Sequence, residues 1–492
     1  MAILNVFAGS GGGVRIPLET PTGFVATPAS GKILLSWTDP VDKVANPGGE
    51  AVATWNYTIV VRKVGSAPQT PGDGVEIVRE HTRNQYQSTT YTDELYIENG
   101  ITYHYAVFAV STIGVWSTPA TATAMPRAET FSYHDSIVLT FPSPGKYATT
   151  ASHTTNHALF TNILTDWSGP EEYTNSVLAV NKEGTQTNLT GEKAVLSAGG
   201  SVDGYAFFAG GHIYADNPFW ISSSGSNYTT STVTVFSPSL SKSTTDLLYG
   251  LDGAMGIASA SISDRIIFAG GHTEDEDAPN GMSAKVRSFT SSRTRYNLSD
   301  LSNARGYAGG ASTSNHAIFA GGFSVAVLSD VSNSGIAYNY VDAYDSSFTK
   351  VSSIANLSVS RGGVGATTVG STAVFAGGRL TGGDTFTNVV EGYNDSLTKI
   401  SLDSLSSSRY AMATVSMGGT AIFAGGSYSN YTFGHSSRPE TTTRKNVDKY
   451  TPTLTKETLP NLNYFGVLSG AMAENIAVFA GDEGNADRYI YQ

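Results

Sequence analysis

The sequence predicts an all-β protein in two parts, and three observations lead to that prediction. A strand-like segment related to AIFAGG recurs through the second half of the chain. The composition favours strands and turns, with 53 Gly and 26 Tyr. Before the repeats, apolar and polar residues alternate around Trp37, as they do in a half-buried strand. At 492 residues, the chain is also longer than one ordinary domain.

Charge and composition exclude several classes of function. Charged residues make up 14% of the chain, and the net charge of −12 includes no basic stripe, so we expect no nucleic-acid partner. The absence of cysteine excludes disulfides and thiolate metal sites. No run of 18 apolar residues occurs, so we expect no insertion into a membrane. The opening residues MAILNVFAGSGGG do not resemble a secretory signal, so we expect no conventional export.

Seven units repeat around a phenylalanine, and neighbouring phenylalanines lie 48 to 60 residues apart. In most units the phenylalanine ends an apolar run that is followed by a glycine pair. A hairpin-like segment such as VDAYDSSFTK comes later, and a Gly/Ala-rich run precedes the next phenylalanine. Each unit is therefore predicted to hold four strands, with the small-residue strand innermost. The repeated residues are Phe160, Phe208, Phe268, Phe319, Phe375, Phe423 and Phe479.

This pattern resembles kelch repeats over about residues 131–492. The double glycines match at Gly210-Gly211, Gly270-Gly271, Gly321-Gly322, Gly377-Gly378 and Gly425-Gly426, and the kelch tyrosine matches at Tyr344, Tyr393 and Tyr450. The usual outer-strand Trp is missing, and the first unit has no glycine pair. The resemblance implies that each unit is one blade of a β-propeller.

The two ends of the repeat region predict how the propeller closes. The seventh unit ends at Gln492 before any outer strand, whereas YHDSIVLTF (Tyr133 to Phe141) resembles an outer strand without a unit of its own. Pairing this segment with the last unit would remove an open sheet edge. We therefore expect a seven-bladed kelch-like propeller over residues 128–492, closed by an N-terminal strand.

A different β-domain precedes the repeats. PTGFVATPASGKILLSWTDP places Trp37 on a second strand, and TYTDELYIENGITYHYAVFAV places Tyr103 where a tyrosine corner belongs. Residues 18–127 thus resemble a fibronectin type III domain, which implies a spacer or docking role. We expect residues 1–17, which are rich in glycine, to be a docking peptide.

The connections between strands predict the binding surface. From the repeated Phe to the next aromatic landmark the spacing varies from 10 to 28 residues, whereas from that landmark to the next Phe it stays between 28 and 32. Insertions of variable length on one face of a ring favour recognition. Aromatic residues amid Ser, Asn and Gly suit a sugar or a protein surface, or pack their own loops. The candidate ligand-binding residues are Tyr214, Phe219, Trp220, Tyr228, Tyr338, Tyr340, Tyr428, Tyr431 and Phe433.

The sequence predicts no catalytic residue, no metal site and no cofactor, and therefore no enzyme. His153 and His157 have a zinc-like spacing but are predicted to lie at a strand turn, and the HTEDED stretch with Glu274 to Asp277 leaves a structural cation open. A copper radical oxidase of kelch type would need a cysteine, which this chain lacks. Lys146, Arg305, Arg361 and Arg409 each precede a repeated Phe by 14 positions, which predicts a structural bond to carbonyls of a neighbouring blade.

Three hypotheses for function follow. The first is a bacteriophage virion protein of a Gram-positive host, associated with a tail fibre or baseplate, made in the host cytoplasm and present in several copies per particle. Its N-terminus would bind other virion proteins, and its propeller would bind a host-surface glycan or protein. A capsid-attached head fibre is a variant of this hypothesis. The second is a bacterial surface adhesin that binds glycans, and the third is a cytoplasmic kelch scaffold or a hydrolase.

Overall fold

The computed structural model describes most of the chain as β-strands and connections. The described residues are 15–29, 31–44, 51–126, 131–140, 145–164, 176–191, 198–213, 228–246, 254–273, 281–324, 335–382, 385–428, 444–465, 469–481 and 485–491. They contain no α-helix. A search of the same residues finds no helix that is long and apolar enough to span a membrane.

The chain divides into two compact units, Met1–Thr130 and Phe131–Gln492. The domain boundary predicted between residues 127 and 128 falls outside the described residues, as does most of the predicted docking peptide.

The first unit holds two antiparallel sheets, ordered β1-β2-β7 and β6-β5-β8-β9, and a small β3-β4 pair. Its strands are β1 (Thr22–Ala29), β2 (Lys32–Thr38), β3 (Lys43–Val44), β4 (Ala51–Ala53), β5 (Trp55–Val64), β6 (Val75–Glu80), β7 (Tyr91–Asp93), β8 (Tyr103–Ser111) and β9 (Ala120–Ala124). The alternating residues of β2 and β8 point into one core, because successive strand residues face opposite sides.

Trp37 and Tyr103 hold that core at two points. The Trp37 ring packs 4.9 Å from the Tyr86 ring, and its Nε1 donates to Asp39 at 3.0 Å. The Tyr103 hydroxyl accepts a hydrogen bond from Glu98 N at 2.9 Å and lies 3.3 Å from Tyr96 O. These bonds fasten the turn before β8 to the strand itself, and they satisfy the polar end of a buried aromatic side chain.

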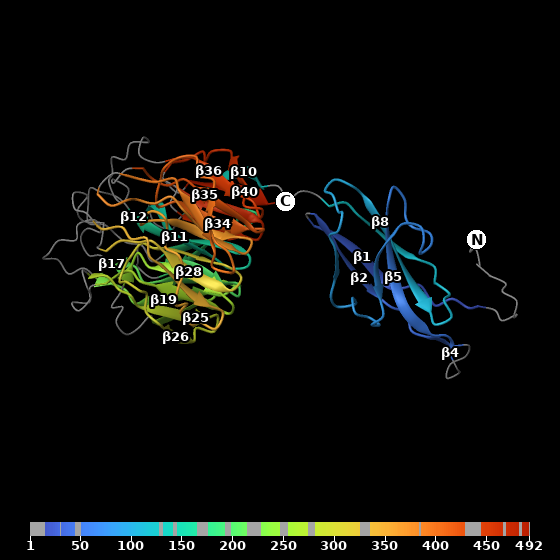
Figure 1. Cartoon of the computed structure of the whole chain (residues 1–492). Helices are drawn as coiled ribbons and strands as arrows, with labels where there is room; N and C mark the ends of the chain where they lie inside the picture. Colours follow the sequence, from blue (N-terminus) through green and yellow to red (C-terminus); the bar gives the residue numbers. More distant parts are fainter. Residues whose placement is uncertain are drawn as a thin grey trace. The chain divides into compact units, whose positions relative to one another are not determined.

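The second unit holds seven antiparallel sheets among the described residues (Figure 1). Five of them have four strands in chain order, and β27-β28-β29 has three. The seventh is ordered β10-β40-β39-β38, so that the first strand of the unit lies at its edge. The first sheets contain β10 (Phe131–Val138), β11 (Gly145–His153), β12 (His157–Leu164), β13 (Ser176–Asn181), β14 (Gln186–Thr190), β15 (Ala198–Val202), β16 (Tyr205–Ala209), β19 (Thr232–Phe236), β20 (Lys242–Asp246), β22 (Ala258–Ile262), β23 (Arg265–Ala269), β25 (Val286–Thr290) and β26 (Arg295–Leu298).

The remaining sheets continue the same pattern. They contain β27 (Gly309–Ser312), β28 (His316–Ala320), β29 (Val341–Asp345), β30 (Gly365–Val369), β31 (Thr372–Ala376), β32 (Val390–Tyr393), β33 (Lys399–Leu402), β34 (Ala413–Met417), β35 (Thr420–Ala424), β36 (Val447–Tyr450), β37 (Lys456–Leu459), β38 (Ser469–Ala473), β39 (Ile476–Ala480) and β40 (Asn485–Tyr491). Two short pairs lie outside these sheets, β17 (His212–Ile213) with β18 (Tyr228–Thr229) and β21 (Ala254–Met255) with β24 (His272–Thr273).

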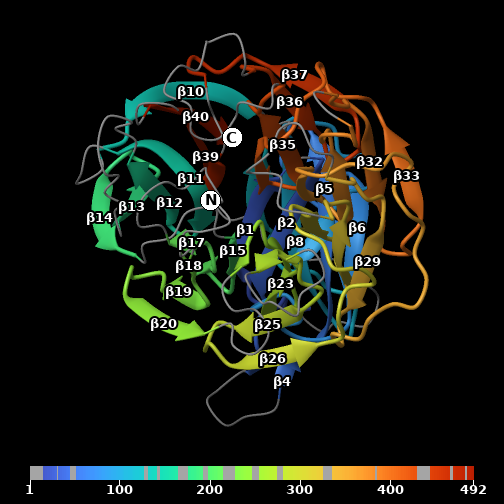
Figure 2. The ribbon, with the colours of Figure 1, turned by 90° about the vertical axis from the view of Figure 1, so that its left-hand side faces the viewer.

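The sheets are arranged around an axis, as the blades of a β-propeller are. Each innermost strand contacts the innermost strands of two other sheets, in the order β11, β15, β22, β27, β30, β34, β38 and back to β11. Figure 2 shows β14, β20, β26, β33, β37 and β10 along the rim. The sheets crowd at the centre: a Cβ on Gly310 would lie 2.2 Å from Ser259 O of the preceding sheet. This contact explains the small residues of the innermost strands.

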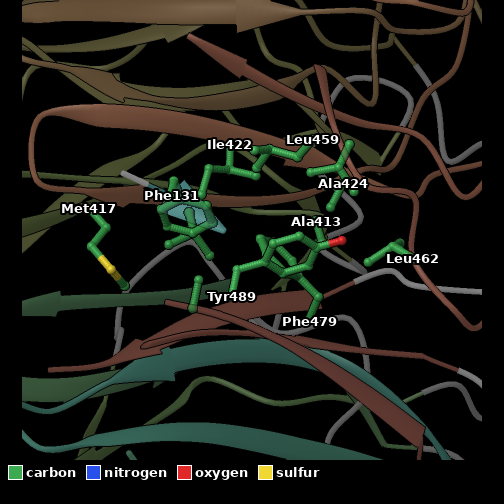
Figure 3. Packing of buried hydrophobic residues seen from close by; sticks show 12 residues of the cluster. Phe131, Ala413, Met417, Ile422, Ala424, Leu459, Leu462, Phe479 and Tyr489 are labelled. Carbon is green, nitrogen blue, oxygen red and sulfur yellow. The ribbon is translucent and has the colours of Figure 1, made fainter. Parts of the chain in front are cut away.

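The N-terminal strand of this unit pairs with its C-terminal strand. β10 is the outer neighbour of β40, with Phe131 opposite Tyr491 and Val138 opposite Asn485. This is the pairing expected from the sequence. Phe131 stacks on Tyr489, with ring centroids 5.8 Å apart, and both belong to an apolar cluster with residues of the β34–β37 sheet (Figure 3).

Candidate functional site

The connections between second and third strands, and the links from one sheet to the next, emerge at the same end of the sheets. We call this end the connection face. Its described residues are 139–140, 191, 210–213, 228–231, 254–257, 270–273, 281–285, 299–308, 321–324, 335–340, 358–364, 377–382, 385–389, 403–412, 425–428, 444–446, 460–465 and 481.

The repeated glycine pairs form the frame of this face. Gly377 has a φ of +62°, and a Cβ there would lie 2.4 Å from Arg409 O. Both the backbone conformation and the close approach therefore require glycine. The next residue, Gly378, donates its N–H to Arg409 O at 2.9 Å. The glycine pair thus fixes the link that leads into the following sheet.

The residue after each glycine pair joins a connection to a link. Phe323 pairs with Gly306 and with Ala337, Arg379 pairs with Gly362 and Phe386, and Ser427 pairs with Tyr410. These backbone bonds recur from sheet to sheet, so the backbone of the connection face is regular. The side chains that it carries differ, as Phe323, Arg379 and Ser427 do at equivalent positions.

Five of the nine candidate binding residues lie outside the described residues: Tyr214, Phe219, Trp220, Tyr431 and Phe433. The stretch from Glu274 to Asp277 does too. Of the described candidates, Tyr228 begins β18 and pairs with Ile213. It therefore belongs to a short strand pair rather than to an irregular loop.

Tyr338, Tyr340 and Tyr428 are half-buried on the connection face. The rings of Tyr338 and Tyr340 lie 5.1 Å apart at 39°. The guanidinium carbon (Cζ) of Arg444 lies over the Tyr428 ring, 4.0 Å from the centroid of that ring. Each ring has one neighbour that orients it and leaves part of its surface in water.

Sequence reasoning missed two further aromatic contacts of this face. Phe386 stacks on Tyr410 with centroids 5.1 Å apart and planes at 15°. Lys445 Nζ lies 4.0 Å from the centroid of the Phe465 ring. Tyr410 and Phe465 lie on links rather than on the variable connections, so a search confined to those connections could not find them. For Tyr410, the sequence did offer one signal: it directly follows Arg409, at the start of the segment that leads into the innermost strand.

Buried ion clusters support the connection face from below. Arg409 Nη2 lies 2.8 Å from Asp448 Oδ2, and Lys456 Nζ lies 3.3 Å from Asp448 Oδ1. The same arginine donates to Phe423 O at 3.2 Å. Burial lowers the pKa of the Arg409 guanidinium, and the Asp448 charge opposes that shift. Equivalent clusters are Arg305, Asp342 and Lys350, and Arg361, Glu391 and Lys399.

These clusters correct the role predicted for the basic residues. The bonded carbonyls belong to Phe319, Phe375 and Phe423, in the sheet that each arginine precedes, and not to a neighbouring sheet. The reason is that each arginine bends back over its own second strand, where a third-strand carboxylate neutralises it. The side chain of Lys146 lies outside the described set.

Burial perturbs two histidines of the second unit, one on the innermost strand β11 and one on β24. His153 Nε2 lies 2.8 Å from Ser201 Oγ, and burial lowers the pKa of His153 to about 4. Burial also lowers the pKa of His272, whose Nδ1 has no hydrogen-bond partner in the described part of the chain. Over the described part of the chain, no three His, Asp or Glu side chains gather as a metal site would need.

Comparisons with known proteins address the fold. No family model matches the sequence. No curated protein matches it. Among solved structures, it is similar to YjhT at 12% identity, over 65% of this chain and 99% of that one, with a TM-score of 0.46. It is also similar to virginiamycin B lyase from Staphylococcus aureus (13% identity, 73% and 99% covered, TM-score 0.44) and to a streptogramin B lyase (11%, 74% and 98%, 0.43).

These similarities correct one prediction. Two of the three proteins are lyases, which contradicts the prediction from the sequence that this chain is not an enzyme. That prediction relied on missing motifs, and a β-propeller can carry catalysis on residues that no short motif reveals. None of the three is described as a kelch, fibronectin type III or phage protein.

Proposed function

We propose that this chain is a bacteriophage virion protein whose propeller binds a receptor on the host surface through the connection face. In this proposal, residues 128–492 form a closed, seven-bladed propeller of kelch type. The cyclic contacts of the innermost strands and the β10–β40 pairing support closure. Residues 18–127 act as a fibronectin type III-like spacer, for which the two-sheet core around Trp37 and the Tyr103 bonds are the support.

The lengths of the connections are the observation that supports binding at this face. Connections between second and third strands range from the four residues 481–484 to the 22 residues 210–231 and 425–446. Connections between first and second strands, at the opposite end, have two or three residues in every sheet. Variation concentrated at one end of a constant frame is typical of a recognition surface.

Attachment to other virion proteins is the remaining part of the proposal. The glycine-rich residues 1–17 are proposed to bind tail or baseplate proteins, so that several copies present their connection faces on each particle. Purified particles, probed with an antibody against this chain, should carry it. Its absence from washed particles would refute the assignment to a virion.

Adsorption to host cells tests the binding role. Replacing Tyr338, Tyr340 and Tyr428 by Ala should reduce adsorption, because each aromatic anchor contributes about 2 kcal/mol, which is about thirtyfold in affinity. Tyr296→Ala is the matched control, since Tyr296 is also an exposed ring beneath an arginine, Arg265, but lies on the outer strand β26. Equal adsorption by the triple variant and the control, with unchanged melting temperatures, would exclude these anchors.

A further inference from the structure

A strip of aromatic and basic side chains crosses the connection face above the β30–β33 and β34–β37 sheets. We call it the basic aromatic strip. All its members except buried Tyr410 are half-buried, so their outer parts reach solvent. Its residues are Phe386, Tyr410, Tyr428, Arg444, Lys445 and Phe465.

Backbone hydrogen bonds make the strip continuous. Tyr410 and Ser427 exchange two N–H···O bonds of 2.9 Å, which place the Phe386–Tyr410 stack beside the segment that carries Tyr428. Arg444 N donates to Gly426 O at 2.9 Å, so the returning chain lies against the same segment. Leu462 N donates to Lys445 O at 2.8 Å, which brings the link with Phe465 alongside.

The strip holds two cations without a carboxylate partner. Among the described residues, neither Arg444 nor Lys445 lies within ion-pair distance of an Asp or Glu. Arg444 covers the Tyr428 ring, and Lys445 covers the Phe465 ring and donates to Asn463 O at 2.6 Å. Ring contacts fix the positions of both cations without neutralising them.

Among the described residues, the buried cluster below the strip supplies no carboxylate that pairs with Arg444. Asp448 is already shared by Arg409 and Lys456. The positive charge of Arg444 lowers the pKa of the Arg409 guanidinium, in the same direction as burial does. Although the chain has a net charge of −12, the described part of this strip therefore presents two adjacent cations next to rings suited to stacking.

We propose that the basic aromatic strip binds an anionic polysaccharide, that is, a sugar polymer with carboxylate or phosphate groups. Sugar rings would pack on Phe386 and on the open edges of Tyr428 and Phe465, as apolar faces pack on aromatic rings. Arg444 and Lys445 would donate charge-assisted hydrogen bonds to the anionic groups. This inference rests on the proposed receptor binding and names its chemical class.

The test measures binding of the full chain to three immobilised polymers: polygalacturonate, phosphomannan and uncharged dextran. We expect binding to at least one charged polymer and weaker binding as salt increases, because salt screens exposed charges. Polygalacturonate alone would identify carboxylate as the anionic group, and phosphomannan alone would identify phosphate. Equal binding to dextran, or binding to none of the three, would overturn the proposal.

Variants then locate the site. Arg444→Gln with Lys445→Gln should weaken binding about tenfold or more and flatten the salt dependence. Arg444→Lys, which keeps the charge, should recover part of the loss. Lys285→Gln is the control, because Lys285 lies on another connection but is paired with Asp300 at 2.9 Å. Charged-polymer binding that the double variant leaves unchanged, with the same melting temperature, would overturn the inference.

Adsorption to cells separates this inference from the proposed function. Adsorption lost in the Tyr338, Tyr340 and Tyr428 variant but kept in the Arg444 and Lys445 variant would leave receptor binding intact and refute the anionic class. Adsorption kept in both would refute receptor binding at this face as well.

Discussion

Two groups of sheets in the second unit share the same strand pairing, glycine pairs and aromatic contacts, which together we call the frame. They differ in whether a buried ion cluster lies beside the third strand. The β27–β29, β30–β33 and β34–β37 sheets are each associated with a buried arginine, a buried carboxylate and a half-buried lysine. In the β15–β20 and β22–β26 sheets, the carboxylate position is held by Thr234 and Arg287. Both groups keep the second-strand phenylalanine and its aromatic partner on the third strand, about 6 Å away.

The comparison shows that the frame does not depend on the ion clusters. Backbone pairing, glycine pairs and aromatic contacts are enough to build a sheet of this kind, because the sheets with Thr234 and Arg287 have the same strand order. A buried ion pair is weak evidence for stability, since desolvation offsets much of its attraction. The clusters instead tie each link to the third strand, below the most regular part of the connection face.

The largest expected effect comes from breaking one cluster. Asp448→Ala should lower the free energy of unfolding by about 3–5 kcal/mol, because Arg409 would remain buried without a counter-charge. Chemical denaturation of the full chain measures this cost. Arg409→Met with Asp448→Leu should restore most of the stability, since no unpaired charge remains. A cost below about 1 kcal/mol for the single substitution would show that water or another group compensates Arg409.

Acid should distinguish the two groups of sheets. His153, between the β11–β14 and β15–β20 sheets, has a pKa of about 4 against an ordinary value of 6.5. Its neutral form is favoured by folding, so its contribution is complete above pH 6.5 and is lost as the pH falls toward 4. The difference corresponds to about 3 kcal/mol.

The cluster of Arg305, Asp342 and Lys350 should respond only at lower pH. Burial opposes ionisation of Asp342, but the Arg305 charge and the bonds from Lys350 and Ser302 hold its pKa below 3.8. Its contribution therefore persists above that value and is lost below it. Melting curves from pH 7 to pH 4.5 should show a loss of stability that His153→Gln reduces, and the remainder is expected from His272, whose pKa burial also lowers. An equal loss in wild type and His153→Gln would assign the acid sensitivity to other groups.

The sequence predicted the frame but not the clusters, for a physical reason. Strands, glycine pairs and the β10–β40 pairing depend on local patterns that repeat at short spacing. Each arginine pairs across a connection of variable length: Arg361 and Glu391 are 30 positions apart, but Arg409 and Asp448 are 39 apart. The arginine position therefore repeats in the sequence, whereas its partner does not repeat at a fixed distance.

The same cause limited the prediction of the site. Tyr338, Tyr340 and Tyr428 lie on connections and were visible as aromatic residues in polar loops. The Phe386–Tyr410 stack joins a connection to the next link, and only the fold brings those two residues together. Arg444 looked like an ordinary charged residue, because the sequence does not show which of the described carboxylates lie near it in the fold.

A smaller effect is expected from the third-strand aromatic residues. In the ion-cluster sheets this residue is a tyrosine, whose hydroxyl donates to the preceding link, as Tyr450 does to Asp403 O at 2.7 Å. The β15–β20 and β22–β26 sheets have Phe236 and Phe289 there, respectively. Tyr450→Phe should cost about 1 kcal/mol of unfolding free energy, because one hydrogen bond is lost and the ring stays packed. A cost above about 3 kcal/mol would show that the hydroxyl organises the whole link.

The smallest effect is expected at Thr234, which holds the Asp448 position in the β15–β20 sheet. Its side chain is buried, and its Oγ1 has no hydrogen-bond partner among the residues that the structure describes. Thr234→Val replaces that hydroxyl by a methyl group of similar size and keeps a β-branched residue in the strand, so the unfolding free energy should stay the same or rise by up to about 1 kcal/mol. The measurement is the same denaturation experiment as for Asp448→Ala. The two positions are equivalent in register. A large loss of stability in Asp448→Ala and none in Thr234→Val would therefore mean that the ion cluster, and not the position in the strand, makes the substitution costly. A loss of about 2 kcal/mol or more in Thr234→Val would instead mean that the hydroxyl is satisfied in solution, and that the β15–β20 sheet also depends on a polar contact at this point.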